Sequence, residues 1–317
     1  MTDALLAPDA LVRAASKARQ TFLCSNIPVL LKDALTSAID RLTAAGVGSP
    51  RLNAELLMMF TLGCDRAYLF AHPERKLTGE EQSRYEGALN QRAHGTPAQY
   101  ITGHQEFWGL DFIVSPAVLI PRPETEHVIE TVLRLHEASS NRDRASSPGP
   151  RPRIVDVGTG SGCIAVALAR EFSHSEIHAT DNSSAALEVA RANAARHQLE
   201  NHIQFHESDL LQGLEPGAFD FVVSNPPYVG ESEADEVQLE VRKFEPRNAV
   251  FAGPTGVEVI ERLIPQAHAT LKPGGWLVIE ISGTIADRVK PMLAGWEQVH
   301  ITNDLQGIPR VAAAKKS

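Results

Sequence analysis

The sequence is poor in cysteine, in long apolar runs and in positive charge, and each shortage excludes a class of protein. The 317 residues include three cysteines, far apart and without C-x-x-C spacing. This argues against a disulfide framework or a zinc site and fits a reducing compartment such as the cytoplasm. No apolar run approaches the ~18 residues that a membrane-spanning helix needs. The net charge of −9 disfavours broad electrostatic binding to nucleic acid.

Several familiar catalytic motifs are also missing. The chain contains no Walker A run, no G-x-S-x-G and no H-E-x-x-H, so these phosphate-binding, hydrolase and metalloprotease signatures are absent. The histidines show no metal-ligand spacing, and we expect no metal site. At 43% hydrophobic and 22% charged residues, the composition is that of an ordinary globular protein. The length suggests about two domains.

The sequence pattern divides the chain into four segments. Residues 1–31 mix short apolar stretches with basic residues and predict an N-terminal extension. Residues 32–97 have helical periodicity and predict a small bundle of three to four helices, whose expected use is substrate recognition. Residues 98–126 predict short strands that form a β-hairpin linker. Residues 127–317 begin with a helix and a loop rich in Ser, Arg and Pro, and then alternate strand with helix, which predicts a mainly parallel sheet.

Local signals locate the helices of the predicted bundle. Ser49 before Pro50 predicts an N-cap with proline at the first helical position. Thr78 and Glu81 have the spacing of a capping box. Between these signals, apolar residues recur at helical spacing and are predicted to be core: Leu52, Leu56, Leu57 and Phe60. Nothing in this segment resembles a catalytic group.

The run Asn-Pro-Pro-Tyr that begins at Asn225 follows an apolar strand pattern. In open α/β sheets, ligands bind beyond the carboxyl ends of the strands. Asn225 offers an amide oxygen as acceptor, and the two prolines remove backbone donors, which leaves carbonyls such as that of Pro226 free. Tyr228 adds a flat apolar wall. Together with Pro227, these residues suit a planar NH2 group, although a simple proline-rich turn is an equally good interpretation at this point.

Three acidic residues follow three successive strand patterns. Asp156 precedes a glycine-rich turn, Asp181 ends the next strand, and Asp209 follows the third. A dinucleotide fingerprint would need its third glycine at the position of Cys163. Asp156 suits an amine-bearing or cationic ligand, Asp181 suits ribose hydroxyls, and Asp209 suits an adenine amino group.

S-adenosyl-L-methionine carries all the groups that these acids would bind: an aminoacyl group, a ribose, an adenine and a sulfonium. We therefore predict it as the cofactor, with S-adenosyl-L-homocysteine as the product. The predicted cofactor-binding residues are Asp156, Gly158, Thr159, Gly160, Ser161, Gly162, Asp181, Asn182, Asp209, Leu210 and Asn225. A single acid of this kind would be interpreted as a surface or capping residue.

The glycine-rich turn and the Asn-Pro-Pro-Tyr run together resemble the class I methyltransferases that modify planar NH2 nitrogens. Four further runs narrow this to the HemK/PrmC family of release factor glutamine methyltransferases. They are Tyr-Ile-Thr-Gly at 100–103, Glu-Phe-Trp-Gly at 106–109, Leu-Ile-Pro-Arg-Pro-Glu-Thr-Glu at 119–126 and Phe-Glu-Pro-Arg at 244–247. The resemblance covers about residues 35–314. Leu210 departs from it, because that position is often a bulky aromatic.

The resemblance implies a Rossmann-like sheet and methyl transfer to the side-chain amide N5 of glutamine in the Gly-Gly-Gln motif of release factors 1 and 2. We expect a monomer that acts in the cytoplasm. Asn225, Pro226 and Tyr228 would then be catalytic, and the same run with Pro227 would bind substrate. The resemblance also makes Arg122 and Glu124 candidate substrate contacts.

Other interpretations stay open at this point. Arg122, Glu124, Glu245 and Arg247 suit structural ion pairs equally well, and Glu280, at a strand end, is a similar case. The main alternative function is an amino-methyltransferase of nucleic-acid bases, acting on adenine N6 or guanine N2, which the acidic charge disfavours. A nicotinamide dehydrogenase and a non-enzymatic S-adenosylmethionine-binding protein are the remaining rivals.

Overall fold

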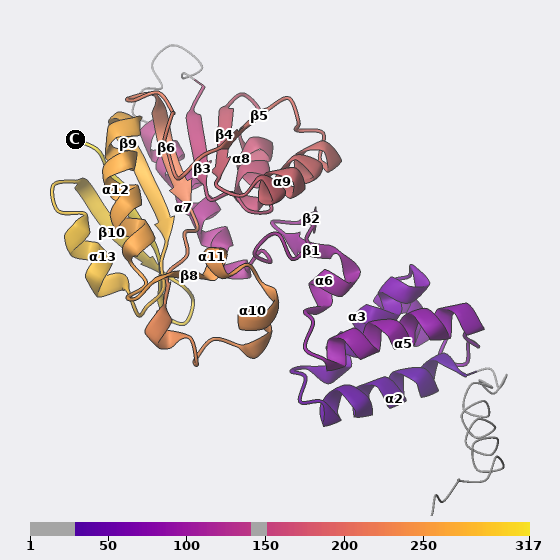
Figure 1. Cartoon of the computed structure of the whole chain (residues 1–317). Coiled ribbons are helices and arrows are strands. Elements are labelled where there is room, and N and C mark those ends of the chain that lie inside the picture. Colours follow the sequence, from indigo (N-terminus) through magenta and orange to yellow (C-terminus); the bar gives the residue numbers. More distant parts are fainter. Residues whose placement is uncertain (1–28, 141–150) are drawn as a thin grey trace, which may run out of the picture. The chain divides into compact units, whose positions relative to one another are not determined.

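The computed structural model describes residues 29–140 and 151–317 (Figure 1). Within these residues the chain forms two compact units, the first ending at His94 and the second spanning Gly95–Ser317. Most of the predicted N-terminal extension and of the Ser-rich loop falls outside the described residues. In the described part of the chain, no helix is long and apolar enough to cross a membrane.

The first unit is helical. Its helices are α2 (Leu31–Ala44), α3 (Pro50–Leu62), α4 (Arg66–Ala71) and α5 (Gly79–Ala93). They pack around buried side chains that include Leu42, Leu57 and Tyr85. The predicted capping box is confirmed, because Thr78 Oγ1 accepts from the Glu81 N–H and Glu81 accepts from the Thr78 N–H. Each bond satisfies a donor that the first turn of α5 would otherwise leave unpaired.

One prediction for α3 is confirmed and another is wrong. Ser49 is the N-cap and Pro50 the first helical residue, although the Ser49 side chain makes no capping bond. The Asn53 side chain donates to the Ser49 carbonyl at 3.2 Å. The prediction of the buried face is wrong. Leu52 and Phe60 are 54% and 49% exposed, and Leu57 alone of the four predicted core residues is buried. The helix is apolar around most of its circumference, so spacing alone does not identify the buried face.

The second unit begins with a short helix and a hairpin. The elements are α6 (Ala98–Thr102), β1 (His104–Phe107), β2 (Leu110–Ile113), the 3-10 turn η1 (Pro123–Thr125) and α7 (Glu126–Ser140). Strands β1 and β2 pair antiparallel. The sequence pattern predicts that the Ser-rich loop begins at His136, but α7 continues to Ser140. The finer division of this unit into a linker over 98–126 and a domain over 127–317 stays a prediction.

A seven-stranded sheet forms the centre of the second unit. Its strands are β3 (Arg153–Val157), β4 (Glu176–Asp181), β5 (Ile203–Glu207), β6 (Phe219–Ser224), β9 (Leu271–Glu280), β10 (Glu297–Asn303) and β11 (Pro309–Lys315). The order is β10-β11-β9-β6-β3-β4-β5, and every pair is parallel except the two that β11 makes. The predicted Rossmann-like sheet is thereby confirmed.

Helices cover both faces of the sheet (Figure 1). The covering helices are α7, α8 (Cys163–Glu171) and α9 (Ser184–Arg196) on one face, and α12 (Glu258–Thr270) and α13 (Ala286–Met292) on the other. Along β6, Phe221 and Val223 join the apolar cluster beneath α7 and α8, whereas Val222 joins the cluster beneath α12 and α13. This alternation follows from the two-residue period of a strand and explains why successive residues of β6 are apolar.

Short elements that the sequence pattern did not predict connect β6 to α12. They are β7 (Val229–Gly230), η2 (Glu231–Glu233), α10 (Leu239–Phe244), α11 (Arg247–Val250) and β8 (Phe251–Gly253). Strands β7 and β8 pair with each other outside the main sheet. None of these elements is long enough to show a period in the sequence.

Strand β9 contains a run that is typical of a turn. The residues Lys-Pro-Gly-Gly at 272–275 predict a turn before a strand over 276–281, but β9 already begins at Leu271. The pairing with β6 moves from Phe219↔Leu271 to Phe221↔Trp276, so the intervening residues of β9 bulge outward. A Cβ at Gly275 would lie 3.1 Å from the Asp220 carbonyl oxygen. The close approach of the two backbones therefore requires glycine there.

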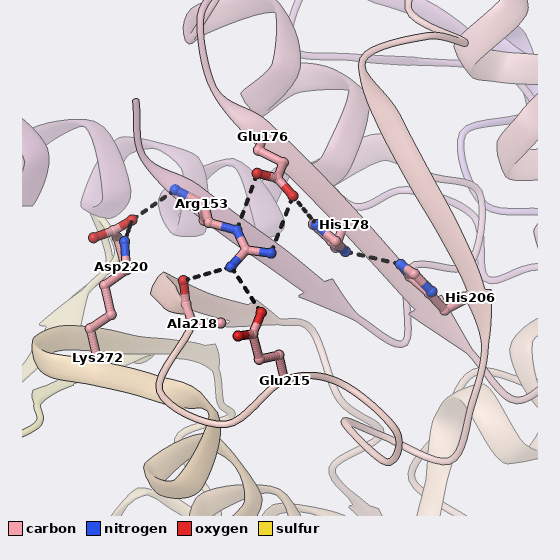
Figure 2. Close-up of polar contacts among 8 residues, drawn as sticks. All are labelled: Arg153, Glu176, His178, His206, Glu215, Ala218, Asp220 and Lys272. Carbon is pink, nitrogen blue, oxygen red and sulfur yellow. Dashed lines mark hydrogen bonds and ion pairs between the residues drawn. The ribbon is translucent and has the colours of Figure 1, made fainter. Parts of the chain in front are cut away.

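A polar network connects the amino ends of the parallel strands (Figure 2). Its members are Arg153, Glu176, His178, His206, Glu215, Asp220 and Lys272. Arg153 pairs with Glu176 at 3.1 Å, and its backbone N–H donates to Asp220 at 2.8 Å. Lys272 pairs with the same Asp220 carboxylate at 2.7 Å. The network joins β3, β4, β6 and β9 at one edge and leaves their carboxyl edge free.

Asn193 connects three parts of the second unit from inside α9. The side chain is fully buried, and its amide donates to the Ile113 carbonyl at 2.9 Å and to the Ser161 carbonyl at 2.8 Å. Its oxygen accepts from the Ile113 N–H at 2.7 Å. The hairpin strand β2 and the glycine-rich turn are therefore held by one side chain.

We expect Asn193→Ala to lower the free energy of unfolding by about 2–4 kcal/mol, because it leaves backbone groups of Ile113 and Ser161 without partners. Chemical denaturation of the full chain measures the change. Glu188→Ala, at an exposed position of the same helix, is the matched control and should change stability by less than about 0.5 kcal/mol. Equal stability of the two variants would contradict this role of Asn193.

Candidate active site

A cavity of about 340 Å³ opens at the carboxyl ends of β3, β4 and β6. This is the edge where the strand order reverses, which is the usual ligand site of such sheets. The predicted site residues that line it are Arg122, Gly158, Thr159, Gly160, Ser161, Asp181, Asn182, Asp209, Leu210, Asn225 and Pro227. Other predicted residues do not line it: Glu124, Asp156, Gly162, Pro226 and Tyr228.

The glycine-rich turn between β3 and α8 forms the floor of this cavity. Gly158, Gly160 and Gly162 have φ values of 69°, 55° and 80°, a region that favours glycine. The N–H of Gly158 donates to the Thr180 carbonyl at 2.8 Å. A Cβ on Gly162 would lie 3.1 Å from that of Ala190, so α9 packs directly against the turn. A Cβ on Gly158 would meet nothing within 4 Å.

Asp181 shapes this turn and also lines the cavity. One carboxylate oxygen accepts from the Gly160 N–H at 2.9 Å, and the other accepts from the Ser183 N–H at 2.9 Å. Burial raises the pKa of Asp181 above its ordinary value, whereas these backbone bonds lower it. Its predicted contact with a ribose stays a prediction, but the location at the end of β4 suits it.

Asp156 lies beneath the turn, and none of its surface is exposed. One oxygen accepts from Thr159 Oγ1 at 2.6 Å and from the Ala165 N–H at 3.2 Å. The other oxygen has no hydrogen-bond partner. Burial raises the pKa of Asp156 to about 7. A buried acceptor without a partner is costly, which makes this oxygen a candidate for a donor that arrives with a ligand.

Asp209 and Leu210 line the cavity at the end of β5. Asp209 forms an ion pair with Arg262, which also lines the cavity. The predicted interaction of Asp209 with an adenine amino group would therefore share the carboxylate with this arginine. Leu210 has a φ of 57°. A branched side chain held in that region is strained, and such strain is commonly found at ligand sites.

Asn225 follows β6 and lies at the edge of the cavity, where its amide is held from one side. Nδ2 donates to Thr125 Oγ1 at 3.0 Å, and Thr125 in turn donates to Glu280 at 2.6 Å. The Tyr228 hydroxyl donates to the other oxygen of Glu280 at 3.1 Å. Glu280 is 1% exposed, and burial raises its pKa to about 7. Burial also raises the pKa of Tyr228.

Arg122, Glu245 and Arg247, from the runs that carry the resemblance, form ion pairs. Arg122 lines the cavity and pairs with the buried Glu245, whose second oxygen accepts from the Ile120 N–H at 3.1 Å. This pair fixes the segment before η1 against the loop after α10. Arg247 pairs with Glu231. A structural role is thus visible for Arg122, Glu245 and Arg247, and substrate contacts of Arg122 and Glu124 stay predictions.

Family models and relatives agree with this geometry. A model of the PrmC N-terminal domain matches residues 33–103, and a model of the methyltransferase small domain matches residues 145–243. A release factor glutamine methyltransferase of Koribacter versatilis (strain Ellin345) is 55% identical over 290 residues, covering 90% of this chain and 98% of the relative. A protein of the same name from Xylella fastidiosa (strain 9a5c) is 39% identical over 284 residues, covering 89% and 98%.

The chain belongs to the release factor glutamine methyltransferase family. The predicted resemblance is confirmed.

A solved structure shows the same fold in a more distant protein. The catalytic domain of human hMettl16, in complex with the MAT2A 3′UTR hairpin 6, has a TM-score of 0.52 and is 18% identical. The match covers 76% of this chain and 84% of that one. At this identity the likeness concerns the fold alone.

The cavity fits the S-adenosyl-L-methionine of such a methyltransferase. The open backbone at Gly158 leaves space for a ligand, and the unpaired Asp156 oxygen could accept from an amine at the turn. Asp181 and Asp209 supply acceptors at the next two strand ends. In a cavity of about 340 Å³, these acidic groups suit a cationic nucleoside better than a pyrophosphate.

Sequence reasoning missed Thr125, Arg262 and the structural use of Glu280. Thr125 lies inside the Pro-Arg-Pro-Glu-Thr-Glu run that carries the resemblance, so that run was the available signal. Its contact with Asn225 joins positions 100 residues apart and has no local signature. Arg262 lies on α12, where an exposed arginine is ordinary.

We expect Asp156→Asn to weaken binding of S-adenosylhomocysteine about 10-fold without lowering stability at pH 8. A carboxyl whose folded pKa is raised costs stability above that pKa, here about 7, and the cost fades as pH falls toward its unfolded value. The amide removes this cost, so any gain in stability should shrink from pH 8 to pH 5. Calorimetric titration and denaturation measure the two effects.

Asp304→Asn is the control, and its effect on stability should have the opposite sign. The Arg310 side chain lowers the pKa of Asp304, so its loss should lower stability at pH 8 and leave cofactor affinity unchanged. Unchanged affinity in Asp156→Asn would remove Asp156 from the cofactor site.

Proposed function

We propose that this protein transfers a methyl group from S-adenosyl-L-methionine to the side-chain amide N5 of the glutamine in the Gly-Gly-Gln motif of release factors 1 and 2. Membership of the release factor glutamine methyltransferase family supports the reaction class and the acceptor. One structural observation supports an amide as the methyl acceptor. The Asn225 side chain lies at the cavity edge, and its NH2 end donates to Thr125. Its oxygen end is then available as an acceptor.

Bound S-adenosyl-L-methionine supplies an electrophilic methyl group on a sulfonium. The residues that would hold it are the glycine-rich turn with Asp156, Asp181 with Asn182 for the ribose, and Asp209 with Leu210 for the adenine. The acidic residues also favour a positively charged ligand over an anionic one.

Asn225 and Pro226 would orient the acceptor. An amide nitrogen is a poor nucleophile, because its lone pair is delocalised into the carbonyl. If Asn225 Oδ1 and the Pro226 carbonyl each accept one N–H of the glutamine, the nitrogen is fixed in one direction. Such positioning is worth up to ~7–11 kcal/mol of barrier. No strong base is required, since the proton can leave after transfer.

Tyr228 would act mainly through the turn. It does not line the cavity, its ring packs against the apolar cluster beneath α12, and its hydroxyl is used on Glu280. These contacts hold the Asn-Pro-Pro-Tyr turn in place, and Pro227 gives it a wall on the cavity side. A direct contact of Tyr228 with the acceptor amide stays a prediction.

Nucleic-acid bases are not favoured as acceptors. The likeness to an RNA-bound methyltransferase domain concerns the fold alone. The net charge of −9 gives no general attraction for phosphates. Release factors act with ribosomes, so the proposed reaction would take place in the cytoplasm, and we propose that a monomer carries it out.

We expect Asn225→Ala to lower kcat with a release factor at least about 100-fold and to weaken binding of S-adenosylhomocysteine far less. Asn225→Asp should also be impaired, because its second oxygen would face the oxygen of Thr125. The assay uses labelled S-adenosylmethionine, with a release factor whose Gly-Gly-Gln glutamine is replaced by alanine as control. Near wild-type turnover of Asn225→Ala, or label on the control substrate, would contradict the proposal.

The helical unit offers a surface for the release factor. Leu52 and Phe60 stand two turns apart on α3, both about half exposed, and Phe70 of α4 is 63% exposed. Apolar side chains so exposed on one small unit are a common feature of protein-binding surfaces. We propose that they contact the release factor, which agrees with the recognition role predicted for residues 32–97.

We expect the double variant Leu52→Ser/Phe60→Ser to raise KM for a release factor about 10-fold, with kcat at saturation unchanged. Steady-state kinetics with varied release factor test this. Arg51→Ser/Glu80→Ser, at exposed polar positions of the same unit, is the control. A fall in kcat with KM unchanged would show that the two apolar residues act otherwise.

A further inference from the structure

The orientation of the Asn225 amide depends on Thr125 and Glu280, which take no direct part in the proposed methyl transfer. A side-chain amide has two ends of nearly equal size, one an acceptor and the other a donor. Which end faces the cavity is therefore decided by what the opposite end meets. In this structure the opposite end meets Thr125 Oγ1 at 3.0 Å, and Thr125 lies 2.6 Å from Glu280.

The charge on Glu280 sets the direction of these hydrogen bonds. An ionised carboxylate only accepts, so the single hydroxyl proton of Thr125 is directed at Glu280. The Tyr228 hydroxyl directs its proton at the other carboxylate oxygen. Toward Asn225 the Thr125 oxygen then presents lone pairs alone. It accepts from Nδ2, which leaves Asn225 Oδ1 on the side away from Thr125.

We propose that Glu280 and Thr125 are positioning residues that hold the amide oxygen of Asn225 toward the acceptor glutamine. This inference rests on the proposed function. If the Asn225 side-chain amide were rotated by half a turn, its NH2 group would face the NH2 group of the glutamine. Two donors cannot form a hydrogen bond with each other. The glutamine nitrogen would then lose one of the two acceptors that aim it.

Protonation of Glu280 removes this preference. A neutral carboxyl can donate to the Thr125 oxygen, which frees the Thr125 proton to bond Asn225 Oδ1 instead. Both orientations of the Asn225 amide then have a partner. The active form of the enzyme is therefore the one with Glu280 ionised, and kcat should rise with pH as that carboxyl titrates.

The surroundings of Glu280 place this titration near neutrality. Burial raises the pKa of Glu280 to about 7. The charge of Glu124 raises it further, whereas Arg310 on β11 and the Tyr228 hydroxyl lower it. The thiol of Cys163 on α8 stays protonated, because burial raises its pKa and the charge of Glu280 raises it further.

The first test compares turnover of three variants across pH 5.5–9. Thr125→Val keeps the size of the side chain but removes the hydroxyl, and should lower kcat about 10- to 100-fold with KM for the release factor little changed. Thr125→Ser keeps the hydroxyl and should restore most of the rate. Glu280→Gln should be slow throughout and should lose the rise in kcat near pH 7.

Each variant is also titrated with S-adenosylhomocysteine, so that a folding defect is recognised. Wild-type kcat in Thr125→Val, or a Glu280→Gln variant that keeps the pH dependence, would overturn the proposal.

A second test needs no methyl acceptor. In protein labelled with ¹⁵N-asparagine, the side-chain NH2 signals of Asn225 are assigned by their loss in Asn225→Ala. They should shift with pH around 7 in the wild type and not in Thr125→Val or Glu280→Gln. The signals of Asn53, which donates to backbone carbonyls, serve as the control and should not respond.

The two tests separate the inference from the proposed function. If the wild type methylates no release factor, the proposed function fails, and the NMR titration still decides whether Glu280 controls Asn225. If the Asn225 signals change neither with pH nor in Thr125→Val and Glu280→Gln, the positioning role is overturned even if methylation is observed.

Discussion

Two fully buried carboxylates hold the two turns from which the site is built. Asp156 accepts from the turn after β3, and Glu280 accepts from Thr125 and from the Tyr228 hydroxyl of the turn after β6. Neither makes an ion pair within the described residues. A buried charge without an ion-pair partner is costly, and the hydrogen-bond donors that converge on each carboxylate offset part of that cost. Removing those donors would cost stability and geometry together.

The sheet and the location of the site could be predicted from the sequence, but the side-chain contacts within them could not. Apolar strand patterns ending in Asp156, Asp181 and Asn225 were enough to predict a parallel sheet with its ligand edge, because strand ends must meet at one side. The contact of Asn225 with Thr125 could not be predicted in this way. It depends on how η1 packs against the sheet, which no local period encodes.

In the helical unit, a local contact was predictable, whereas the buried face of a helix was not. The capping box at Thr78 is a local arrangement of four residues and was predictable, because the bonds it makes are set by spacing alone. The buried face of α3 was not, since apolar residues lie on most sides of that helix and the burial of Leu57 rather than Leu52 is decided by α2 and α5. Exposure of apolar residues there becomes visible only in three dimensions.

Different kinds of contact hold the two edges of the sheet, where the parallel strands begin and where they end. The amino edge is joined by partly exposed ion pairs such as Lys272 with Asp220, whose strength falls as salt screens them. At the carboxyl edge, the hydrogen bonds of Asp156 and Glu280 are buried, so salt hardly weakens them. Lineages adapting to different ionic conditions could therefore exchange charges along the amino edge, as in the network of Figure 2, and tune stability while the geometry of the cofactor cavity is inherited unchanged.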